Sequence, residues 1–466
     1  MDNTENSGPQ KWYQGITRYQ WLVLTIASLG WVFDIFEGQI FVASMRDAMP
    51  DLLGVSADED AVRVWNDYAF GFFLLGGAFG GVVFGMLSDR IGRSKTMIIT
   101  ILFYSLFTCL SAFSQEPWHM VVLRFLVAMG VGGEWAVASA MVAEVMPKRS
   151  RPVMSSIFHA SSVFGTLLAV AAVALLIGNE QLNAKLAGIG IDGWRAGFAI
   201  GVLPAFLTLW VRWKLREPDS WVAARDRAKE DESQATGRIG DLFSKDHFKN
   251  TVIGVSLATI GLVTFWGGHI YGKNALMRHA QAEALSVEGV TSDSNKTLKA
   301  EVYNKHKSKI KTAEMTSMAL NTIGAGLGLV LFGGISSRIG RKGAFILYHV
   351  MAFLMMILLF KGLIASNASP LALKLCLPVF GFFTVGMHAG YAVYFPELYP
   401  TRLRGTGTGF CFNMGRLGTA AAFFGFAAMA SPPAPEVKAM WLSPLFLLGA
   451  LIVLFAKETK DEDLPE

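Results

Sequence analysis

A short polar turn between two apolar runs reads Gly85-Met86-Leu87-Ser88-Asp89-Arg90-Ile91-Gly92-Arg93-Ser94-Lys95. The flanking runs, residues 66–87 and 96–113, are each close to the length of about 20 apolar helical residues that crosses a bilayer. We call residues 85–95 the first signature turn. Its position predicts that two membrane helices meet here at one membrane face, with three cations crowded between them.

A reduced second copy of this turn, the second signature turn, reads Gly333-Gly334-Ile335-Ser336-Ser337-Arg338-Ile339-Gly340-Arg341-Lys342. Its offset from the first is 338 − 90 = 248 residues, and Ser337 stands where the first copy has Asp89. Another motif repeats at an offset of 397 − 144 = 253, since Glu144-Val145-Met146-Pro147-Lys148-Arg149-Ser150-Arg151 corresponds to Glu397-Leu398-Tyr399-Pro400-Thr401-Arg402-Leu403-Arg404. Two motifs that recur at nearly one spacing predict a duplicated membrane unit.

The composition also indicates a membrane protein. Of the 466 residues, 52% are hydrophobic and 17% are charged, whereas soluble domains average about 25% charged residues. The net charge of +5 comes from cations clustered in short loops, so it indicates topology and not nucleic-acid binding. Cys109, Cys376 and Cys411 all lie in apolar runs and predict neither a disulfide framework nor a metal site.

Hydropathy predicts an all-α membrane protein with twelve transmembrane helices in two six-helix bundles. The predicted spans are residues 20–45, 66–87, 96–114, 117–145, 152–178, 193–214, 250–271, 313–336, 343–365, 370–395, 404–430 and 437–457. The cations of the repeated motifs all fall on one side of this topology. We expect that side to be cytoplasmic, with both termini on it, in a bacterial inner membrane.

The predicted organisation has five parts along the chain. They are a cytoplasmic tail (1–19), a first bundle (20–214), a cytoplasmic linker (215–249), a second bundle (250–457) and a second tail (458–466). The alternating charges of the linker predict a solvated surface helix. The lysine-rich outer loop 272–312 is predicted to be an insertion with some helix, because long loops cross membranes regardless of charge.

Two acids lie within the first predicted span. Asp34 and Glu37 are three residues apart and so adjoin on one helix face. Asp34 is 13 residues past Trp21, or about 20 Å at ~1.5 Å per residue, which is near the middle of the membrane. Two close carboxylates in a low-dielectric site favour binding a proton between them, as a proton carrier needs. The alternative is a structural hydrogen bond to a neighbouring helix.

The fourth predicted span adds three candidates. Arg124 and Trp135 are eleven residues apart and share a helix face, while Glu134 is turned aside from them. Arg124 could pair with an acid of the first span, hold a substrate carboxylate in its planar fork, or only brace the bundle. Glu134 is a further candidate for carrying the proton.

The second half offers a polar stripe and a buried cation. Thr384, His388 and Tyr391 follow helical spacing in the tenth span, and the eleventh carries Asn413 and Arg416. Arg416 lies near mid-membrane, where a cation needs an acidic partner or an anionic ligand. Three further histidines are interpreted as hydrogen-bonded packing residues: His159, His269 and His349.

The two signature turns resemble the glycine-, aspartate- and arginine-containing turn of the major facilitator superfamily of secondary transporters. That resemblance implies a gating role for residues of the repeated motifs, namely Gly85, Asp89, Arg90, Gly92, Arg93, Glu144, Arg149, Gly333, Arg338, Gly340, Arg341, Glu397 and Arg402. The chain is also similar to the metabolite:proton symporter branch, which includes aromatic-acid and sialate carriers. This second likeness rests on residues 34–37, 124–135, 193–195, 216–221 and 405–416.

The sequence therefore predicts a proton-coupled symporter of a small organic anion that works by alternating access. Asp34, with Glu37 or Glu134, would take the proton, and Arg124 and Arg416 would draw the anion. Trp135, His388, Tyr391 and Asn413 would shape the site. A carrier of neutral sugars or polyols, an exporter, and a membrane sensor or scaffold remain alternatives.

Several other classes are excluded at this level. No nucleotide-binding loop, metal cluster or nucleophile–base pair is present in the sequence, so we expect neither an enzyme nor a primary pump and no cofactor. The expected partners are the small-molecule substrate, protons and the lipid bilayer, with no nucleic acid, for a protein acting as a monomer.

Overall fold

The computed structural model describes residues 11–56, 59–172, 175, 180–188, 190–291, 295–427 and 435–466. The predicted span ends at 176–178 and 428–430, and residues 1–10 of the predicted tail, lie outside this part. The first part of the chain forms α1 (Arg18–Leu53), α2 (Asp60–Ile91), α3 (Arg93–Ser111), α4 (Pro117–Val145), α5 (Arg151–Ala160), α6 (Ser162–Ala172), α7 (Glu180–Ala187), α8 (Gly193–Ala199), η2 (Ile200–Val202), α9 (Ala205–Lys214), α10 (Asp219–Glu230), η3 (Glu232–Gln234) and η4 (Ile239–Phe243).

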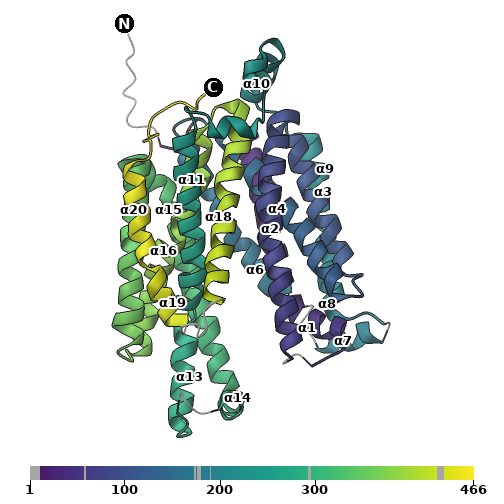
Figure 1. Cartoon of the computed structure of the whole chain (residues 1–466), viewed down its shortest axis with the longest axis vertical. Helices are drawn as coiled ribbons and strands as arrows, with labels where there is room; N and C mark the ends of the chain where they lie inside the picture. Colours follow the sequence, from purple (N-terminus) through teal and green to yellow (C-terminus); the bar gives the residue numbers. More distant parts are fainter. Residues whose placement is uncertain are drawn as a thin grey trace. The chain divides into compact units, whose positions relative to one another are not determined.

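The second part is also helical (Figure 1). It forms α11 (Phe248–Thr264), η5 (Phe265–His269), α12 (Ile270–Gly272), α13 (Ala275–Val287), α14 (Lys296–Lys305), α15 (Lys307–Met356), η6 (Ile357–Ile364), α16 (Pro370–Gly386), α17 (His388–Tyr394), η7 (Phe395–Leu398), η8 (Thr401–Leu403), α18 (Arg404–Ala427), α19 (Pro435–Leu442) and α20 (Pro444–Leu454). No strand occurs among the described residues.

The contacts within the chain define two compact units. Unit 1 comprises Met1–Ser244, Ala392–Phe410 and Thr459–Glu466, and unit 2 comprises Lys245–Tyr391 and Cys411–Glu458. Two short segments from late in the chain thus belong with the first half, and both take part in the site described below.

The helices account for the predicted spans. Nine helical stretches of the described residues are long and apolar enough to cross a membrane. One of them, Lys307–Ile364, contains two predicted spans. The backbone of Gly340 within it is non-helical and separates the two spans. The span predicted at 193–214 is broken into α8, η2 and α9, and the span predicted from 404 is α18. With these three, the described helices match all twelve predicted spans.

Glycines let the helices of unit 1 approach closely. α2 packs along α4 at Gly76 and Gly80, where a methyl group would meet the backbone carbonyls of Phe125 and Met129. Small residues at such crossings are the usual device for close packing in membranes.

Unit 2 repeats this crossing between α15 and α16. A methyl group at Gly324 or Gly328 would meet the carbonyl of Pro378 or Phe382. The glycines stand 248 residues after their counterparts (324 − 76 and 328 − 80), and the carbonyls stand 253 residues after theirs (378 − 125 and 382 − 129). The two offsets read from the sequence motifs therefore also relate the helix packing.

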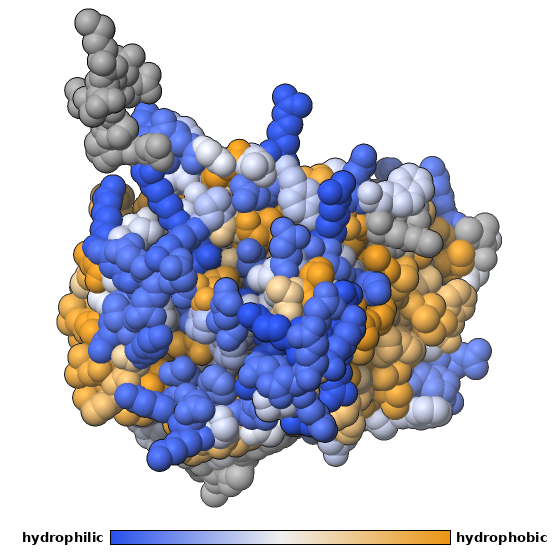
Figure 2. Space-filling view, turned by 90° about the horizontal axis from the view of Figure 1, so that it is seen from above, coloured by the Kyte–Doolittle hydropathy of each residue, from blue (hydrophilic) through white to orange (hydrophobic). Residues whose placement is uncertain are grey.

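Two segments outside the predicted spans are ordered, and only the first of them differs from the prediction. The linker helix α10 was expected to be solvated, but its Trp221 and Ala224 are buried. The outer insertion forms α13 and α14, which pack together around Ala284, Leu285 and Val302 (Figure 1). Figure 2 looks onto the end that carries α10, where hydrophilic side chains gather, while hydrophobic ones show along the flanks.

Candidate functional site

The backbone of both signature turns depends on one glycine. α2 ends at Ile91, Gly92 has φ +116°, and α3 begins at Arg93. In the second turn Gly340 has φ +85° within α15. Side chains other than glycine rarely adopt such angles, so each glycine permits the reversal between two helices.

A glutamate outside each turn binds the helix that follows it. In unit 1, Glu217 accepts hydrogen bonds from the backbone N–H groups of Arg93 (2.6 Å), Ser94 (3.2 Å) and Lys95 (3.3 Å). These are first-turn donors of α3 that have no partner within the helix, and the helix dipole favours an anion there. The sequence interpretation did not include Glu217.

Unit 2 has the equivalent contact. Glu458 accepts from the N–H groups of Arg341 (2.8 Å) and Lys342 (3.1 Å). A Cβ atom at Gly92 or Gly340 would collide with the carboxylate of Glu217 or Glu458, so each glycine also makes room for its glutamate. The available signal was an acid just past the last predicted span of each bundle.

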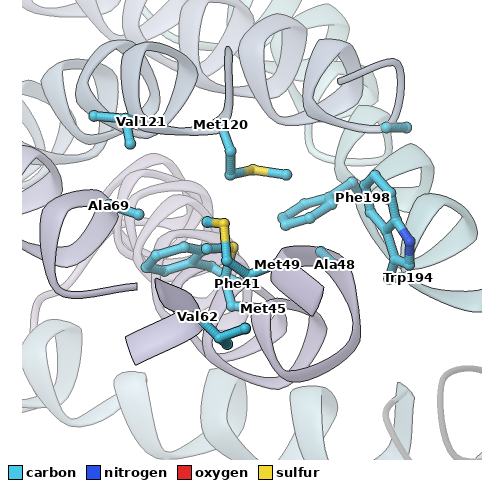
Figure 3. Close-up of a cluster of buried hydrophobic side chains, with 11 residues drawn as sticks. Phe41, Met45, Ala48, Met49, Val62, Ala69, Met120, Val121, Trp194 and Phe198 are labelled. Carbon is cyan, nitrogen blue, oxygen red and sulfur yellow. The ribbon is translucent and has the colours of Figure 1, made fainter. Parts of the chain in front are cut away.

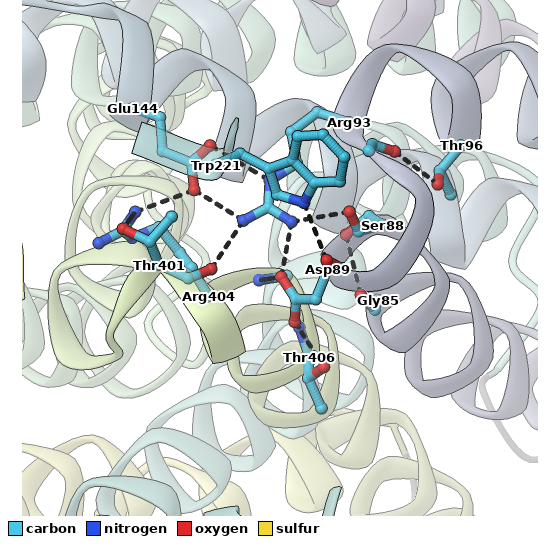
Figure 4. Close-up of polar contacts among 12 residues, drawn as sticks. Gly85, Ser88, Asp89, Arg93, Thr96, Glu144, Trp221, Thr401, Arg404 and Thr406 are labelled. Atoms are coloured by element: carbon cyan, nitrogen blue, oxygen red, sulfur yellow. Dashed lines mark hydrogen bonds and ion pairs between the residues drawn. The ribbon is translucent and has the colours of Figure 1, made fainter. Parts of the chain in front are cut away.

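Asp89 joins the first signature turn to the start of α18 (Figure 4). Its Oδ1 accepts from Arg93 Nη1 (2.6 Å) and from the N–H of Gly405 (3.0 Å). Its Oδ2 accepts from the N–H (2.8 Å) and the hydroxyl (2.6 Å) of Thr406. Asp89 therefore caps a helix from a distant part of the chain while pairing with Arg93.

Arg93 lies at the centre of a buried charge cluster (Figure 4). It binds Glu144 through Nη2 (2.7 Å) and Nε (3.1 Å), and it also donates to the carbonyl of Thr401 (3.0 Å). Arg404 donates to Glu144 as well (2.9 Å). The side chains of Arg93, Glu144 and Arg404 have no exposed surface, so this two-pronged pairing is shielded from water.

The linker and the chain end close over this cluster within unit 1. The indole of Trp221 donates to the carbonyl of Asp89 (2.8 Å). Arg404 donates to the carbonyl of Pro465 (2.8 Å), and Thr459 donates to Glu397 (2.5 Å). Arg404 thus donates both to the carboxylate of Glu144 and to backbone carbonyls.

The second repeated motif also keeps its contacts at a constant offset. Arg151 Nε donates to the carbonyl of Ala143 (2.9 Å), and Arg404 Nε donates to that of Pro396 (3.0 Å). Both residues of the pair are displaced by 253 positions (404 − 151 and 396 − 143).

The remaining residues of the predicted gating motif differ in how much of their surface is exposed. Arg341 and Glu397 are buried. Arg90, Arg149 and Arg338 are exposed, and Arg402 is half-buried in an ion pair with Asp241. Gly85 meets the backbone of Gly405, whereas Gly333 accepts a hydrogen bond from Ser336 (3.0 Å). The gating role that the family resemblance implies for Arg90, Arg149 and Arg338 stays a prediction.

Three acids of unit 1 lie buried at one level of the helix bundle. Asp34 and Glu37 on α1 and Glu134 on α4 are each no more than 2% exposed. Glu134 reaches α1 because Gly30 lacks a side chain: a Cβ there would collide with the Glu134 carboxylate. Tyr104 on α3 is completely buried, and Gly130, four residues before Glu134 on α4, lies against its backbone and Cβ. Sequence reasoning missed Tyr104, since an aromatic residue in an apolar run looks like core.

Arg124 pairs with Glu37. Its Nη1 lies 2.5 Å from Glu37 Oε1, and its Nη2 donates to the hydroxyl of Ser111 (2.5 Å). Its guanidinium also lies over the rings of Phe41 (5.2 Å) and Phe198 (4.8 Å), which belong to the core cluster of Figure 3. Of the three arrangements considered for Arg124, the structure contains the one in which it pairs with an acid of the first span.

Trp135 lies next to Glu134 and is fully buried against His159. Its indole N–H donates to His159 Nδ1 (3.1 Å), while Trp31 donates to the carbonyl of His159 (3.1 Å). Because Nδ1 accepts a hydrogen bond, His159 is present in the form that is unprotonated at that atom. This is the packing role predicted for His159, with two tryptophans as its partners.

The predicted substrate residues of unit 2 lie on α17 and α18. Tyr391 donates to the carbonyl of Leu257 (2.9 Å) and stacks on Phe345, and His388 contacts its ring edge-on (5.4 Å between centroids). Asn413 is fully buried on α18, and Arg416 is half-buried one turn further along. These are polar groups that could orient a small ligand.

His269 sits in η5, a π-helical turn between α11 and α12. It is stacked between Phe265 and Phe380 and lies 2.8 Å from the Thr384 hydroxyl and 3.2 Å from the Asn321 amide. The packing role predicted for it fits these contacts. Among the described residues, no group of three or more His, Cys, Asp or Glu side chains could hold a metal ion.

Comparison with known proteins places these features in a family context. A family model described as Major Facilitator Superfamily matches residues 27–423. The sialic acid transporter NanX of Escherichia coli is 28% identical over 411 residues, covering 88% of this chain and 87% of that protein. The cis,cis-muconate transport protein of Acinetobacter baylyi is 28% identical over 391 residues, covering 83% and 84%.

A third relative is the gentisate transporter of Corynebacterium glutamicum, 25% identical over 414 residues, covering 86% of this chain and 79% of that protein. Among solved structures, the proton:xylose symporter XylE bound to 6-bromo-6-deoxy-D-glucose superposes with a TM-score of 0.72. The match covers 96% of this chain and 98% of XylE at 18% identity, and at that identity it is evidence for the fold alone.

Proposed function

This chain belongs to the major facilitator superfamily, and we propose that it is a proton-coupled symporter of a small organic anion. Membership confirms the predicted fold, an all-α membrane protein of two six-helix bundles. It also confirms the predicted class, a multi-pass membrane transporter and not an enzyme. The substrate class, the coupling and the roles of individual residues make up the proposal.

The observation that carries the coupling is the buried acid group of unit 1. Of the three acids, Glu37 is paired with Arg124. Glu134 has neither a salt bridge nor a hydrogen-bond partner for its carboxylate oxygens among the described residues. An ionised carboxylate is costly to bury without a partner, so a proton bound while the site is closed and released when water enters would suit Glu134. Asp34 adjoins it and is the proposed coupling acid.

The anionic substrate is supported by two independent features. The three relatives are named for sialic acid, muconate and gentisate, all carboxylic acids. Arg416 lies within an apolar helix, where a cation costs at least ~2.5–3.5 kcal/mol on insertion scales, and a bound carboxylate would offset that cost. Arg124 is engaged by Glu37, and we assign the binding of the substrate carboxylate to Arg416.

Alternating access would open and close the charge cluster around Arg93. We propose that the contacts from Asp89, Arg93 and Glu144 to residues 401–406 hold one side shut and break when that side opens. We place this side in the cytoplasm, with both termini, in a bacterial inner membrane and with the monomer as the working unit.

The test of the substrate class uses matched acids and amides. Proteoliposomes containing the purified protein would be given labelled cis,cis-muconate, gentisate or sialic acid outside, together with unlabelled competitors, and uptake of the label would be measured. We expect gentisate to compete and its neutral amide to fail, because only the acid carries the charge that Arg416 would bind. Equal competition by the amide would contradict the anion proposal and favour a carrier of neutral solutes.

Two variants refine this test. Arg416→Lys keeps the charge but loses the planar fork, so we expect weaker apparent affinity with transport retained. Arg416→Ala should abolish transport. If Arg416→Ala transports the acid normally, the arginine does not bind the substrate.

A further inference from the structure

Tyr104 occupies a position that packing between three helices fixes. It lies on α3 and is completely buried. On α4, Gly130 lies against the Tyr104 backbone and Cβ, and a side chain at Gly130 would collide with them. Glu134 follows Gly130 by four residues and therefore faces the same way, toward the Tyr104 side chain.

The same relation recurs on α1. Gly30 lies against the Glu134 carboxylate, and Asp34 follows Gly30 by four residues on the same face. The missing side chains of Gly30 and Gly130 thus bring Asp34, Glu134 and Tyr104 together from α1, α4 and α3.

The third acid, Glu37, has partners of its own. Glu37 is engaged by Arg124 and by the hydroxyl of Thr108 (3.1 Å), so its charge is balanced. The segment η2, which packs on α3 one turn away at Thr108, contains no ionisable side chain. Asp34 and Glu134 are therefore the two groups between which Tyr104 can pass a proton.

We propose that Tyr104 relays the coupled proton between Glu134 and Asp34, an inference that rests on the proposed proton symport. When the Glu134 carboxyl gives its proton to the Tyr104 oxygen, the hydroxyl hydrogen of Tyr104 passes to an Asp34 carboxylate oxygen. Tyr104 is neutral before and after the step, and one of the two acids holds one proton throughout. The relay lets the proton move between α4 and α1 without water entering the bundle.

The test replaces one hydroxyl. Tyr104→Phe keeps the ring and its packing but removes the relay. Wild-type and variant proteins in proteoliposomes would be supplied with whichever of cis,cis-muconate, gentisate and sialic acid the wild type transports. Two rates would be recorded: substrate exchange at equal pH, and proton uptake that accompanies net substrate uptake, followed with an internal pH dye.

We expect Tyr104→Phe to keep exchange within about twofold of wild type and to lose about tenfold in proton-coupled uptake, equivalent to ~1.4 kcal/mol on the barrier. Tyr348→Phe is the matched control, because Tyr348 is equally buried and its hydroxyl donates to a backbone carbonyl, that of Gly328 (2.9 Å). The control should change the ratio of proton to substrate little. Glu134→Gln is a second variant, and it should show the same split between exchange and coupling.

The outcomes separate this inference from the proposed function. If the wild type moves substrate without protons, the proposed symport is wrong and the relay with it. If the wild type couples and Tyr104→Phe couples equally well, the relay is wrong while symport stands. Loss of exchange together with coupling in both Tyr104→Phe and Glu134→Gln would show that the two residues serve only packing.

Discussion

At the first signature turn, Arg93 is held by two carboxylates, and Asp89 caps the start of α18. At the second, the position of Asp89 is Ser337, whose hydroxyl donates to the carbonyl of Gly333 four residues earlier (2.8 Å). The two turns nevertheless share the positive-φ glycine and a glutamate that binds the first N–H groups of the following helix. The two copies thus share the backbone conformation of the turn and the glutamate at the helix start, while their other side chains differ.

The same contrast extends into the helix bundles. Unit 1 buries Asp34, Glu37 and Glu134, whereas among the described residues of unit 2 no Asp or Glu is buried. The buried titratable groups of unit 2 include His269, His349 and His388. Equal topology with unequal charge fits the proposed roles, in which the first half carries both the coupled proton and the charge cluster around Arg93.

The largest effect is expected at the centre of the buried charge cluster, at Arg93. Arg93→Met would leave Asp89 and Glu144 buried without their main cation, which typically costs 3–5 kcal/mol. We expect a marked fall in the thermal unfolding temperature of the detergent-purified protein. Arg90→Met, in the same turn but exposed, is the control and should change that temperature little. Equal effects would mean that burial of the charge is irrelevant.

The next effect compares the two turns directly. Asp89→Asn loses the charge and one of the two carboxylate oxygens, of which Oδ2 accepts both hydrogen bonds from Thr406, whereas Ser337→Ala loses one neutral hydrogen bond. Hydrogen bonds to charged groups contribute about 1.5–3 kcal/mol and neutral ones about 1 kcal/mol. We expect transport to slow about tenfold or more in Asp89→Asn and to change much less in Ser337→Ala, with surface amounts measured in parallel. Equal slowing would indicate a purely topological role for both turns.

A smaller effect should be equal in the two halves. Glu217→Gln and Glu458→Gln each remove an anion from a helix N-terminus, an interaction of about 0.3–1 kcal/mol at exposed sites and up to ~2 when partly buried. Both variants should lower the unfolding temperature slightly and by similar amounts. A large difference between the two variants would show that Glu217 and Glu458 do not stabilise their helices equally.

The smallest effect concerns exposed charge in unit 2. Hydrogen bonds from Lys305 and His306 hold the pKa of Glu288 below its ordinary value of 4.5. A lowered folded-state pKa gives stability that is present above pH 4.5 and is lost as pH falls below it. Amide hydrogen exchange in α13 and α14 should therefore accelerate under acid conditions, and Glu288→Gln should weaken that pH dependence. An unchanged pH profile in Glu288→Gln would rule out this carboxylate as the cause.

Sequence predicted the fold well because its signals are long or repeated. Apolar runs of membrane length mark the spans, and the offsets of 248 and 253 residues recur in the packing of Gly76 and Gly324. The break within the span 193–214 was not predicted, since hydropathy does not register where a helix is interrupted. Trp221 was missed because a charge pattern alone does not show which face of a helix is docked.

The site was predicted less completely, for a physical reason. Buried acids stand out in an apolar run, so Asp34 and Glu134 could be singled out from sequence. Their partner Tyr104 could not, because its role depends on two glycines on other helices, Gly30 and Gly130. Pairing is likewise three-dimensional: Arg124 had three possible arrangements, and only the structure places it on Glu37.

The central claim is that buried acids of the first half couple transport to protons, and Asp34→Asn tests it most directly. Proteoliposomes containing wild type or the variant would be given an inward proton gradient and the transported acid, with substrate accumulation and internal pH recorded together. We predict that the wild type concentrates the acid and acidifies the interior, while Asp34→Asn only exchanges substrate across the membrane. Accumulation against a gradient by Asp34→Asn at the wild-type rate, with the same proton entry, would contradict the account.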